Sequence, residues 1–148
     1  MKITDMLKKD LMLLELKAGS KEEVVGELVD ALVKKGIVSN REGFVNAVME
    51  REKMSSTGIG MGIAIPHGRS NAVSKPSIVF GKSTKGIDYQ SLDGEPAYIF
   101  FLIAVPEDSN NEHLKVLSQL SRKLMHEDVR EKLIASTNEA EVISAFQE

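Results

Sequence analysis

The sequence contains no cysteine, and this absence excludes several kinds of chemistry at once. Without thiols, the 148-residue chain has no disulfide framework, no thiolate nucleophile and no cysteine-based metal site. The chain also lacks an apolar run long enough to span a membrane, and its first residues, MKITDMLKKD, lack the apolar segment of a signal peptide. These absences favour a cytoplasmic protein that does not insert directly into a membrane.

Acidic residues are missing from one part of the chain, although they are in slight excess over the whole of it. The formal net charge of −3 argues against a nucleic-acid-binding protein, which usually has a basic excess. Residues 53–87 include no Asp or Glu, and they include these cations: Lys53, Arg69, Lys75, Lys82 and Lys85. A locally cationic stretch suits an anionic ligand or a phosphoryl group, with chance composition as the alternative explanation.

Several familiar motifs are also absent. No G-x-x-x-x-G-K-[ST] is present, so there is no Walker-type nucleotide loop. The glycines at 58, 60 and 62 precede a predicted strand instead of opening a helix, which argues against a dinucleotide fingerprint. The histidines lack the local H-x-x-x-H spacing of a zinc site. The absence of these motifs therefore argues against a nucleotide loop, a dinucleotide site and a zinc site.

Helix signals are frequent along the chain. Two capping-box patterns, Ser20 with Glu23 and Ser39 with Glu42, each stand before a run of apolar residues at helical spacing. Arg51 falls in the last turn of the second run, where a cation complements the helix dipole. These signals, with further runs of the same spacing, predict helices over residues 20–36, 40–53, 113–125, 128–135 and 138–146.

Short apolar runs between these helices predict the strands. The longest, AYIFFLIAV at residues 97–105, is typical of a central strand that is covered on both faces. Because helices alternate with strands, we expect residues 1–148 to form a single α/β domain with a mixed sheet flanked by helices on both faces. Other strands are predicted over residues 11–16, 61–65 and 77–83, and a helical turn at residues 4–7 stays open.

The segment SSTGIGMGIAIPHGRS, residues 55–70, carries the clearest functional signal. His67 stands between Pro66 and Gly68, directly after the predicted strand, where loop residues often carry chemistry. A neutral imidazole is a competent nucleophile near neutral pH. We therefore interpret His67 as a nucleophile that accepts a phosphoryl group and passes it on. The alternative is an inert histidine that caps a turn.

Other polar groups near this segment are candidates for holding a phosphoryl group. Phosphoryl transfer needs mainly positioning and stabilisation of the equatorial oxygens, which glycine amides and an arginine can supply. Arg51 and Arg69 are either phosphate clamps or ordinary surface charges. The hydroxyl residues either bind the anion or cap the loop. The supporting residues predicted here are Ser56, Thr57, Gly58, Gly60, Gly68 and Arg69.

His113 follows the predicted strand at 97–105 and a polar loop, and it opens a helix. It could face His67 across one crevice, because ligands of open α/β sheets bind beyond the carboxyl ends of the strands. The alternative is a partly buried structural histidine. His126 is expected to be a solvated residue at a helix end. The helix after His113 is predicted to bury a stripe formed by Leu114, Leu117, Leu120 and Leu124.

Four segments resemble the enzyme IIA proteins of the bacterial phosphoenolpyruvate-dependent sugar phosphotransferase system, of the fructose/mannitol type. Ser55 stands where many members have glycine, and this change removes none of the inferred site groups. The matching segments are STGIGMGIAIPHG (56–68) for the active site, AVMEREK (47–53) for an arginine-bearing helix end, SLDGEPAYIFFLIAVPE (91–107) for the central strand and NEHLKVLSQLSRKL (111–124) for a second-histidine helix.

This resemblance implies that His67 is phosphorylated by the phosphocarrier HPr and then donates the phosphoryl group to a cysteine of a IIB domain. The IIB domain in turn links the chain to a IIC membrane component, which is a partner only through IIB. It implies that His113 and Arg51 assist, that no metal or cofactor takes part, and that the fold is a mixed sheet flanked by helices. A fructose-like sugar fits the motifs. The alternative is a nitrogen-regulatory relative, whose phosphorylation changes its binding to a target protein.

Overall fold

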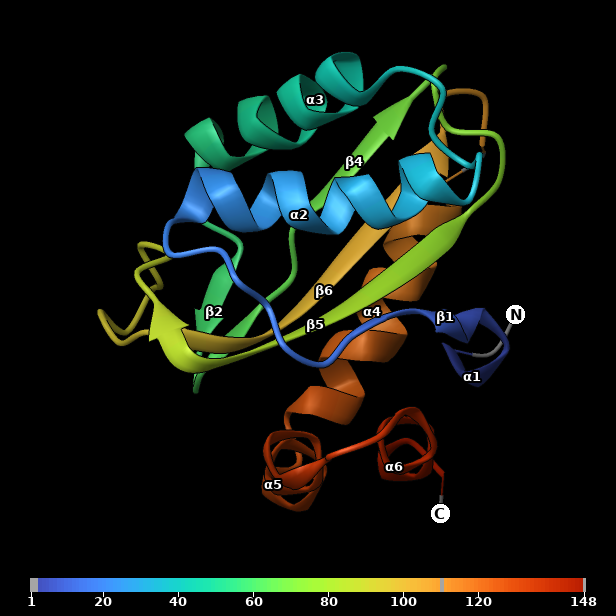
Figure 1. Ribbon diagram of the computed structural model, residues 1–148. Helices are drawn as coiled ribbons and strands as arrows, with labels where there is room; N and C mark the ends of the chain where they lie inside the picture. Colours follow the sequence, from blue (N-terminus) through green and yellow to red (C-terminus); the bar gives the residue numbers. More distant parts are fainter. Residues whose placement is uncertain (1–2, 110, 148) are drawn as a thin grey trace.

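The computed structural model describes residues 3–109 and 111–147 (Figure 1). The helices are α1 (Ile3–Met6), α2 (Lys21–Lys34), α3 (Arg41–Met54), α4 (Glu112–Leu124), α5 (Glu127–Ala135) and α6 (Glu139–Ala145). The strands are β1 (Leu7–Leu13), β2 (Gly58–Gly60), β3 (Ile63–Ala64), β4 (His67–Ser70), β5 (Ser77–Ile87) and β6 (Ala97–Pro106).

The strands form one mixed sheet, as the alternation of helices and strands predicted. Its order is β1-β5-β6-β3-β2, and β4 also pairs with β6. The β1–β5, β3–β6 and β4–β6 pairs are parallel, whereas β5–β6 and β2–β3 are antiparallel. Strand β6 lies inside the sheet and is buried along most of its length, which confirms the central strand predicted from its apolar run.

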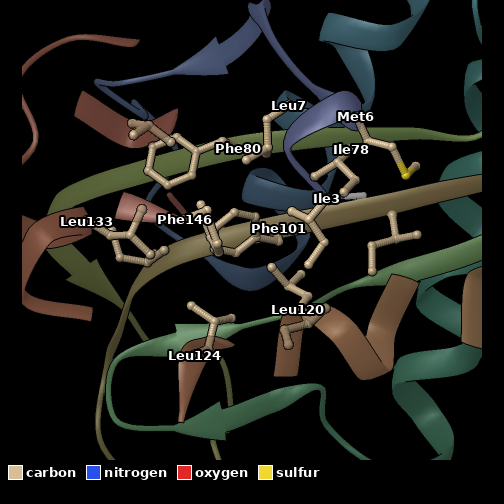
Figure 2. Packing of buried hydrophobic residues seen from close by; sticks show 14 of the residues in the cluster. Ile3, Met6, Leu7, Ile78, Phe80, Phe101, Leu120, Leu124, Leu133 and Phe146 are labelled. Atoms are coloured by element: carbon tan, nitrogen blue, oxygen red, sulfur yellow. The ribbon is translucent and has the colours of Figure 1, made fainter. Parts of the chain in front are cut away.

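Helices cover both faces of this sheet, which confirms the predicted layers (Figure 1). One face packs against α2 and α3, with Leu28 and Phe44 fully buried there. The other face packs against α1, α4, α5 and α6. Figure 2 shows this second cluster, in which Phe101 of β6 lies among side chains from the surrounding helices. The sheet is therefore the middle layer between two groups of helices.

The helix ends agree with the predictions in most places and differ at α3. Ser20 caps α2 by accepting a hydrogen bond from the Glu23 amide, as its capping box predicted. The cap of α3 is Asn40, which accepts from the Gly43 amide, and not Ser39. The Ser39 hydroxyl instead donates to the carbonyl of Ala72, so the second capping-box prediction was wrong in its residue.

Two further predictions need correction. Leu114 was predicted to lie on the buried face of α4, but it is 54% exposed. Val116 lies on that buried face instead. The first strand spans residues 7–13 instead of 11–16, because α1 occupies only Ile3–Met6 and the chain extends directly after it. The strand predicted over residues 77–83 is correct in place and continues to Ile87.

Strands β3 and β4 behave as one strand with a break at residues 65–66. Ile63 pairs with Ile99 and His67 pairs with Ile103, so the offset along β6 is the same before and after the break. Pro66 cannot donate a hydrogen bond, but its carbonyl still accepts from the Ile103 amide at 3.0 Å. His67 thus follows the end of a strand, as predicted, but it is the first residue of β4, so the expectation that it lies in a loop was wrong.

Candidate functional site

The position of His67 in the sheet determines which face its ring occupies. Side chains alternate along an extended segment, and Ile63 and Ile65 belong to the cluster on the α4 side of the sheet. His67 continues that series, so its ring lies on the α4 side. Gly68 faces the other way, toward α3. The His67 side chain is half-buried at this edge of the sheet.

A single hydrogen bond defines the state of the His67 ring. Its Nδ1 lies 3.0 Å from the backbone carbonyl oxygen of Ile65. A carbonyl oxygen can only accept, so in the neutral ring Nδ1 carries the hydrogen and donates it. The lone pair is then on Nε2, which has no hydrogen-bond partner among the described residues. Nε2 is therefore the atom that can attack an electrophile.

The surroundings of His67 keep the ring neutral. Burial lowers the pKa of His67, and the positive charge of Arg51 lowers it further. The Ile65 carbonyl and the negative charge of Glu52 act in the opposite direction, and the net effect is a pKa below the ordinary value of 6.5. At neutral pH the ring is thus in the unprotonated form that a nucleophile needs.

Arg51 lies in the last turn of α3, as predicted, and its Nη1 donates to the carbonyl of Ser55 at 3.0 Å. Helix α3 comes close to β4 because Gly68 has no side chain. A Cβ atom at Gly68 would lie 3.0 Å from Val48 and 3.1 Å from Phe44, both on α3. The small size of Gly68 therefore brings the cationic end of α3 to the strand that carries His67.

Ser56 and Thr57 have hydrogen-bond partners within the protein. The Ser56 hydroxyl donates to the carbonyl of Tyr89 at 2.8 Å and accepts from the Gly58 amide at 3.0 Å. The Thr57 hydroxyl donates to the carboxylate of Glu52, and Thr57 is buried. These contacts order the segment before His67 and leave no free hydroxyl hydrogen for an anion.

The glycine turn lies against a carboxylate, although its own sequence contains no acid. The Met61 amide donates to Asp93 at 2.9 Å, and a Cβ atom on Gly60 would lie 3.1 Å from the same carboxyl group. The amides of Met61 and Glu95 hold the pKa of Asp93 below its usual value, so it is ionised at neutral pH. Such a turn repels a phosphate, which argues against the anion-binding role predicted for Gly60.

Close packing explains the other early glycine. A Cβ atom on Gly58 would lie 2.9 Å from the Cα atom of Ser91, so no larger residue fits there.

Gly60 and Met61 both have positive φ angles, 95° and 59°, because the chain reverses between β2 and β3 at this point. The predicted strand over residues 61–65 was therefore wrong at its start, where Met61 is exposed.

The remaining candidates lie further along the chain. Arg69 is exposed and, two residues after His67 in β4, lies on the same side of the strand. His113 falls in the first turn of α4, but its side chain lies outside the described residues, so its approach to His67 stays a prediction. His126 is exposed just before α5, as predicted.

Sequence reasoning missed a buried polar group beside these residues. Glu52 is only 6% exposed, and its carboxylate contacts Thr57, Tyr89 and Lys21. A signal for its burial exists, because Phe44, Val48 and Glu52 follow one another at intervals of four residues along α3. The acidic residue therefore continues the apolar stripe of the helix into the site.

The chain belongs to a family of phosphotransferase proteins. A family model described as "Phosphoenolpyruvate-dependent sugar phosphotransferase system, EIIA 2" matches residues 5–148. This match confirms the family to which the four sequence segments pointed. Within the part of the chain that the structure describes, no helix combines the length and the apolar character needed to cross a membrane.

Two curated relatives carry fructose-specific names. The chain is 44% identical over its full length to the PTS system fructose-specific EIIABC component of Bacillus subtilis, of which it spans 23%. It is 42% identical, over 94% of its length, to the PTS system fructose-specific EIIA component of Haloferax volcanii, of which it spans 90%. The chain thus matches a short part of one relative and nearly all of the other.

Two solved structures share the fold over nearly the whole chain. The nitrogen regulatory protein IIA-Ntr from Neisseria meningitidis has a TM-score of 0.89 and 31% identity, covering 98% of this chain and 99% of that one. Enzyme IIA for mannitol from Escherichia coli, solved in complex with phosphorylated enzyme IIB, has a TM-score of 0.81 and 30% identity, covering 95% and 96%. Both named types of IIA protein therefore have this architecture.

Proposed function

We propose that this chain is a phosphocarrier that takes a phosphoryl group from phosphorylated HPr onto His67 and gives it to a cysteine of a IIB domain during sugar uptake. The observation that carries the proposal is the hydrogen bond from Nδ1 of His67 to the Ile65 carbonyl, which leaves Nε2 as the free nucleophile. Family membership and the mannitol IIA–IIB complex among the structural neighbours support it.

The two transfers balance around one nitrogen atom. In the first, the Nε2 lone pair of His67 forms a bond to phosphorus while the bond between phosphorus and the donor breaks, and that electron pair stays with the donor. In the second, a thiolate of the IIB domain forms a sulfur–phosphorus bond while the Nε2–phosphorus bond breaks and its electron pair returns to Nε2. The hydrogen on Nδ1 takes part in neither step and stays hydrogen-bonded to the Ile65 carbonyl.

Cationic groups are placed to stabilise the charge that moves in these steps. Phosphoryl transfer depends mainly on positioning and on stabilisation of the equatorial oxygens. Arg51 lies close enough to His67 to lower its pKa, and Arg69 extends from the same strand as His67. We assign Arg51 as an assisting group and Arg69 as a supporting one. His113 is a further assisting group in this proposal, on the basis of the family resemblance.

A fructose-like sugar is the substrate class that we favour, since the two curated relatives described above, from Bacillus subtilis and Haloferax volcanii, are named as fructose-specific. A regulatory role is the second candidate. The observation that favours it is the similarity to the nitrogen regulatory protein, which has the higher TM-score of the two neighbours described. In that role, phosphorylation of the same histidine would change the binding of a target protein.

The direct test is phosphorylation in a purified system. The chain is incubated with phosphoenolpyruvate, enzyme I and HPr, and its intact mass is measured before and after acid treatment. We expect an acid-labile gain of one phosphoryl group that disappears in His67→Ala and persists in the control His126→Ala. A His67→Ala variant that gains the group as readily as the unmodified chain would overturn the site.

The second candidate needs a different acceptor. Phosphorylated protein is mixed with a fructose-type IIB domain, and loss of the phosphoryl group is followed by mass. Rapid loss to the IIB cysteine supports the sugar-uptake role. Stable phosphohistidine in the presence of this acceptor, together with a protein partner that binds only one phosphorylation state, supports the regulatory role.

A further inference from the structure

Glu52 is the most buried charged residue among those described, at 6% exposure, and its side chain is 2% exposed. Its Oε1 accepts from the Thr57 amide at 3.0 Å and lies 3.0 Å from Nζ of Lys21. Its Oε2 accepts from the hydroxyls of Thr57 and Tyr89. Donors thus converge on both oxygens, which suits a carboxylate.

We propose that Glu52 is a positioning residue, which holds the His67 ring in the orientation that exposes Nε2. This inference rests on the proposed phosphocarrier function and deepens it. Glu52 does not touch the reacting atoms in this account. It acts through the backbone of two residues that lie between it and the ring, Thr57 and Ile65.

A continuous series of hydrogen bonds connects Glu52 to the ring. The carboxylate holds both the amide and the hydroxyl of Thr57. The Thr57 carbonyl accepts from the Ile65 amide at 3.0 Å. The Ile65 carbonyl in turn accepts from Nδ1 of His67 at 3.0 Å. A shift of Thr57 would therefore move the carbonyl that selects the tautomer of His67.

Lys21 of α2 and Tyr89, in the segment between β5 and β6, also contact the Glu52 carboxylate. Lys21, at the start of α2, pairs with it while its ammonium lies 4.7 Å from the centre of the Tyr89 ring. Tyr89 donates its hydroxyl to Glu52 at 3.1 Å and accepts from the Ser56 hydroxyl through its own carbonyl. Burial raises the pKa of Tyr89, so its hydroxyl stays a donor. These contacts fix the carboxylate independently of α3.

The charge of Glu52 also acts on the ring directly. The charges of neighbouring residues Arg51 and Glu52 affect the His67 pKa in opposite directions. The acid therefore offsets part of the influence of the arginine on the resting ring. A merely structural ion pair would stabilise the fold without a connection to the ring, and this difference can be measured.

The test compares Glu52→Gln with the unmodified chain in the purified phosphorylation system. Glutamine has one acceptor oxygen where the carboxylate has two, so it cannot receive all these donors. We expect the maximum rate of phosphoryl acceptance at saturating phosphorylated HPr to fall about tenfold with KM unchanged, the effect of a misplaced reacting group. In the unphosphorylated protein, the ring ¹⁵N shifts of His67 should show that the Nδ1–H tautomer no longer dominates.

A matched control lies on the same helix. Glu50 forms an exposed pair with Lys53, so Glu50→Gln removes the same charge two residues earlier without touching the network. Its transfer rate and His67 tautomer should equal those of the unmodified chain. Thr57→Val is the second test variant, because it removes only the hydroxyl link to Glu52. It should shift the tautomer in the same direction, and it decides the matter if Glu52→Gln does not fold.

Two outcomes are decisive. A folded Glu52→Gln or, failing that, Thr57→Val variant that keeps the Nδ1–H tautomer and the original rate overturns the positioning role, even if it melts at a lower temperature. A chain that is not phosphorylated at all overturns the proposed function instead. The tautomer measurement on the unphosphorylated protein still tests Glu52 in that case.

Discussion

The two faces of the sheet are both apolar, but only one has buried charge at its edge. On the α4 side, Phe101 makes edge-on contacts with Phe80 and Phe146, with ring centroids 5.3 and 5.7 Å apart (Figure 2). On the α2–α3 side, the apolar cluster gives way to the pair of Glu52 and Lys21 near the end of α3. Among the described residues, Glu52 is the one charged residue that is buried.

This difference separates the apolar packing around Phe101, which stabilises the fold, from the charged network around Glu52, which we connect to the site. Apolar burial is favourable wherever side chains fit, whereas a buried ion pair often gains little over apolar residues of the same size. The Glu52 network is therefore poorly explained by stability alone. It occurs where the backbone before His67 must be held in one arrangement. The comparison predicts that damage to the two faces has different consequences.

The largest expected effect is on stability, from the apolar face. Phe101→Ala should lower the free energy of unfolding by about 4 kcal/mol, because it removes a fully buried ring and leaves a cavity. Urea unfolding followed by circular dichroism measures this loss. At a temperature where the variant is folded, phosphorylation should still occur on His67. A variant that is fully folded yet inactive would break the comparison.

A smaller loss is expected from the charged edge. Lys21→Met should lower the free energy of unfolding by about 3 kcal/mol, because the carboxylate of Glu52 then stays buried without its partner. It should also slow phosphoryl transfer, unlike Phe101→Ala. Lys53→Met, which breaks an exposed pair, is the control and should leave both stability and transfer unchanged. Equal behaviour of the two lysine variants would contradict the account.

The third expected effect is a change in pH dependence. Folding lowers the pKa of His67 below 6.5, so the folded protein binds this proton less readily than the unfolded chain. His67 therefore costs stability as the pH falls through 6.5, and the cost becomes constant below the pKa of the folded state. Because the ring stays neutral somewhat below pH 6.5, the rate at which His67 accepts a phosphoryl group should stay high just below that pH. The rate should fall only as the ring becomes protonated.

Arg51→Ala sharpens this prediction. It removes the second cause of the lowered pKa, so the His67 titration followed by NMR should move to higher pH. Arg51→Lys keeps the charge and should leave the midpoint near that of the unmodified chain. An unchanged midpoint in Arg51→Ala would show that the arginine does not act on the ring.

Much of the fold follows from local sequence patterns. The apolar run at residues 97–105 predicted the central strand, and Ser20 with Glu23 predicted the start of α2. These features depend on residues close together in the chain. The predictions at Met61 and Ser39 were wrong because contacts with Asp93 and Ala72, remote in sequence, determine the local structure.

The site shows the same limit more strongly. The sequence predicts His67 from its own Pro-His-Gly segment, whereas the role proposed for Arg51 comes from the family resemblance. The absence of acids from residues 53–87 favours an anion site at the glycine turn, but Asp93 contacts this turn from another segment and argues against it. The network around Glu52 joins α2, α3 and the segment before β6, and no single stretch of sequence shows that junction.

The most direct test of the central claim is the identity of the phosphorylated atom. The protein is labelled with ¹⁵N in its histidines, phosphorylated, and examined for ³¹P–¹⁵N coupling by NMR. The account predicts coupling to Nε2 of His67, with Nδ1 still protonated and bound to the Ile65 carbonyl. Coupling to Nδ1 of His67, or to a nitrogen of His113 or His126, would contradict it.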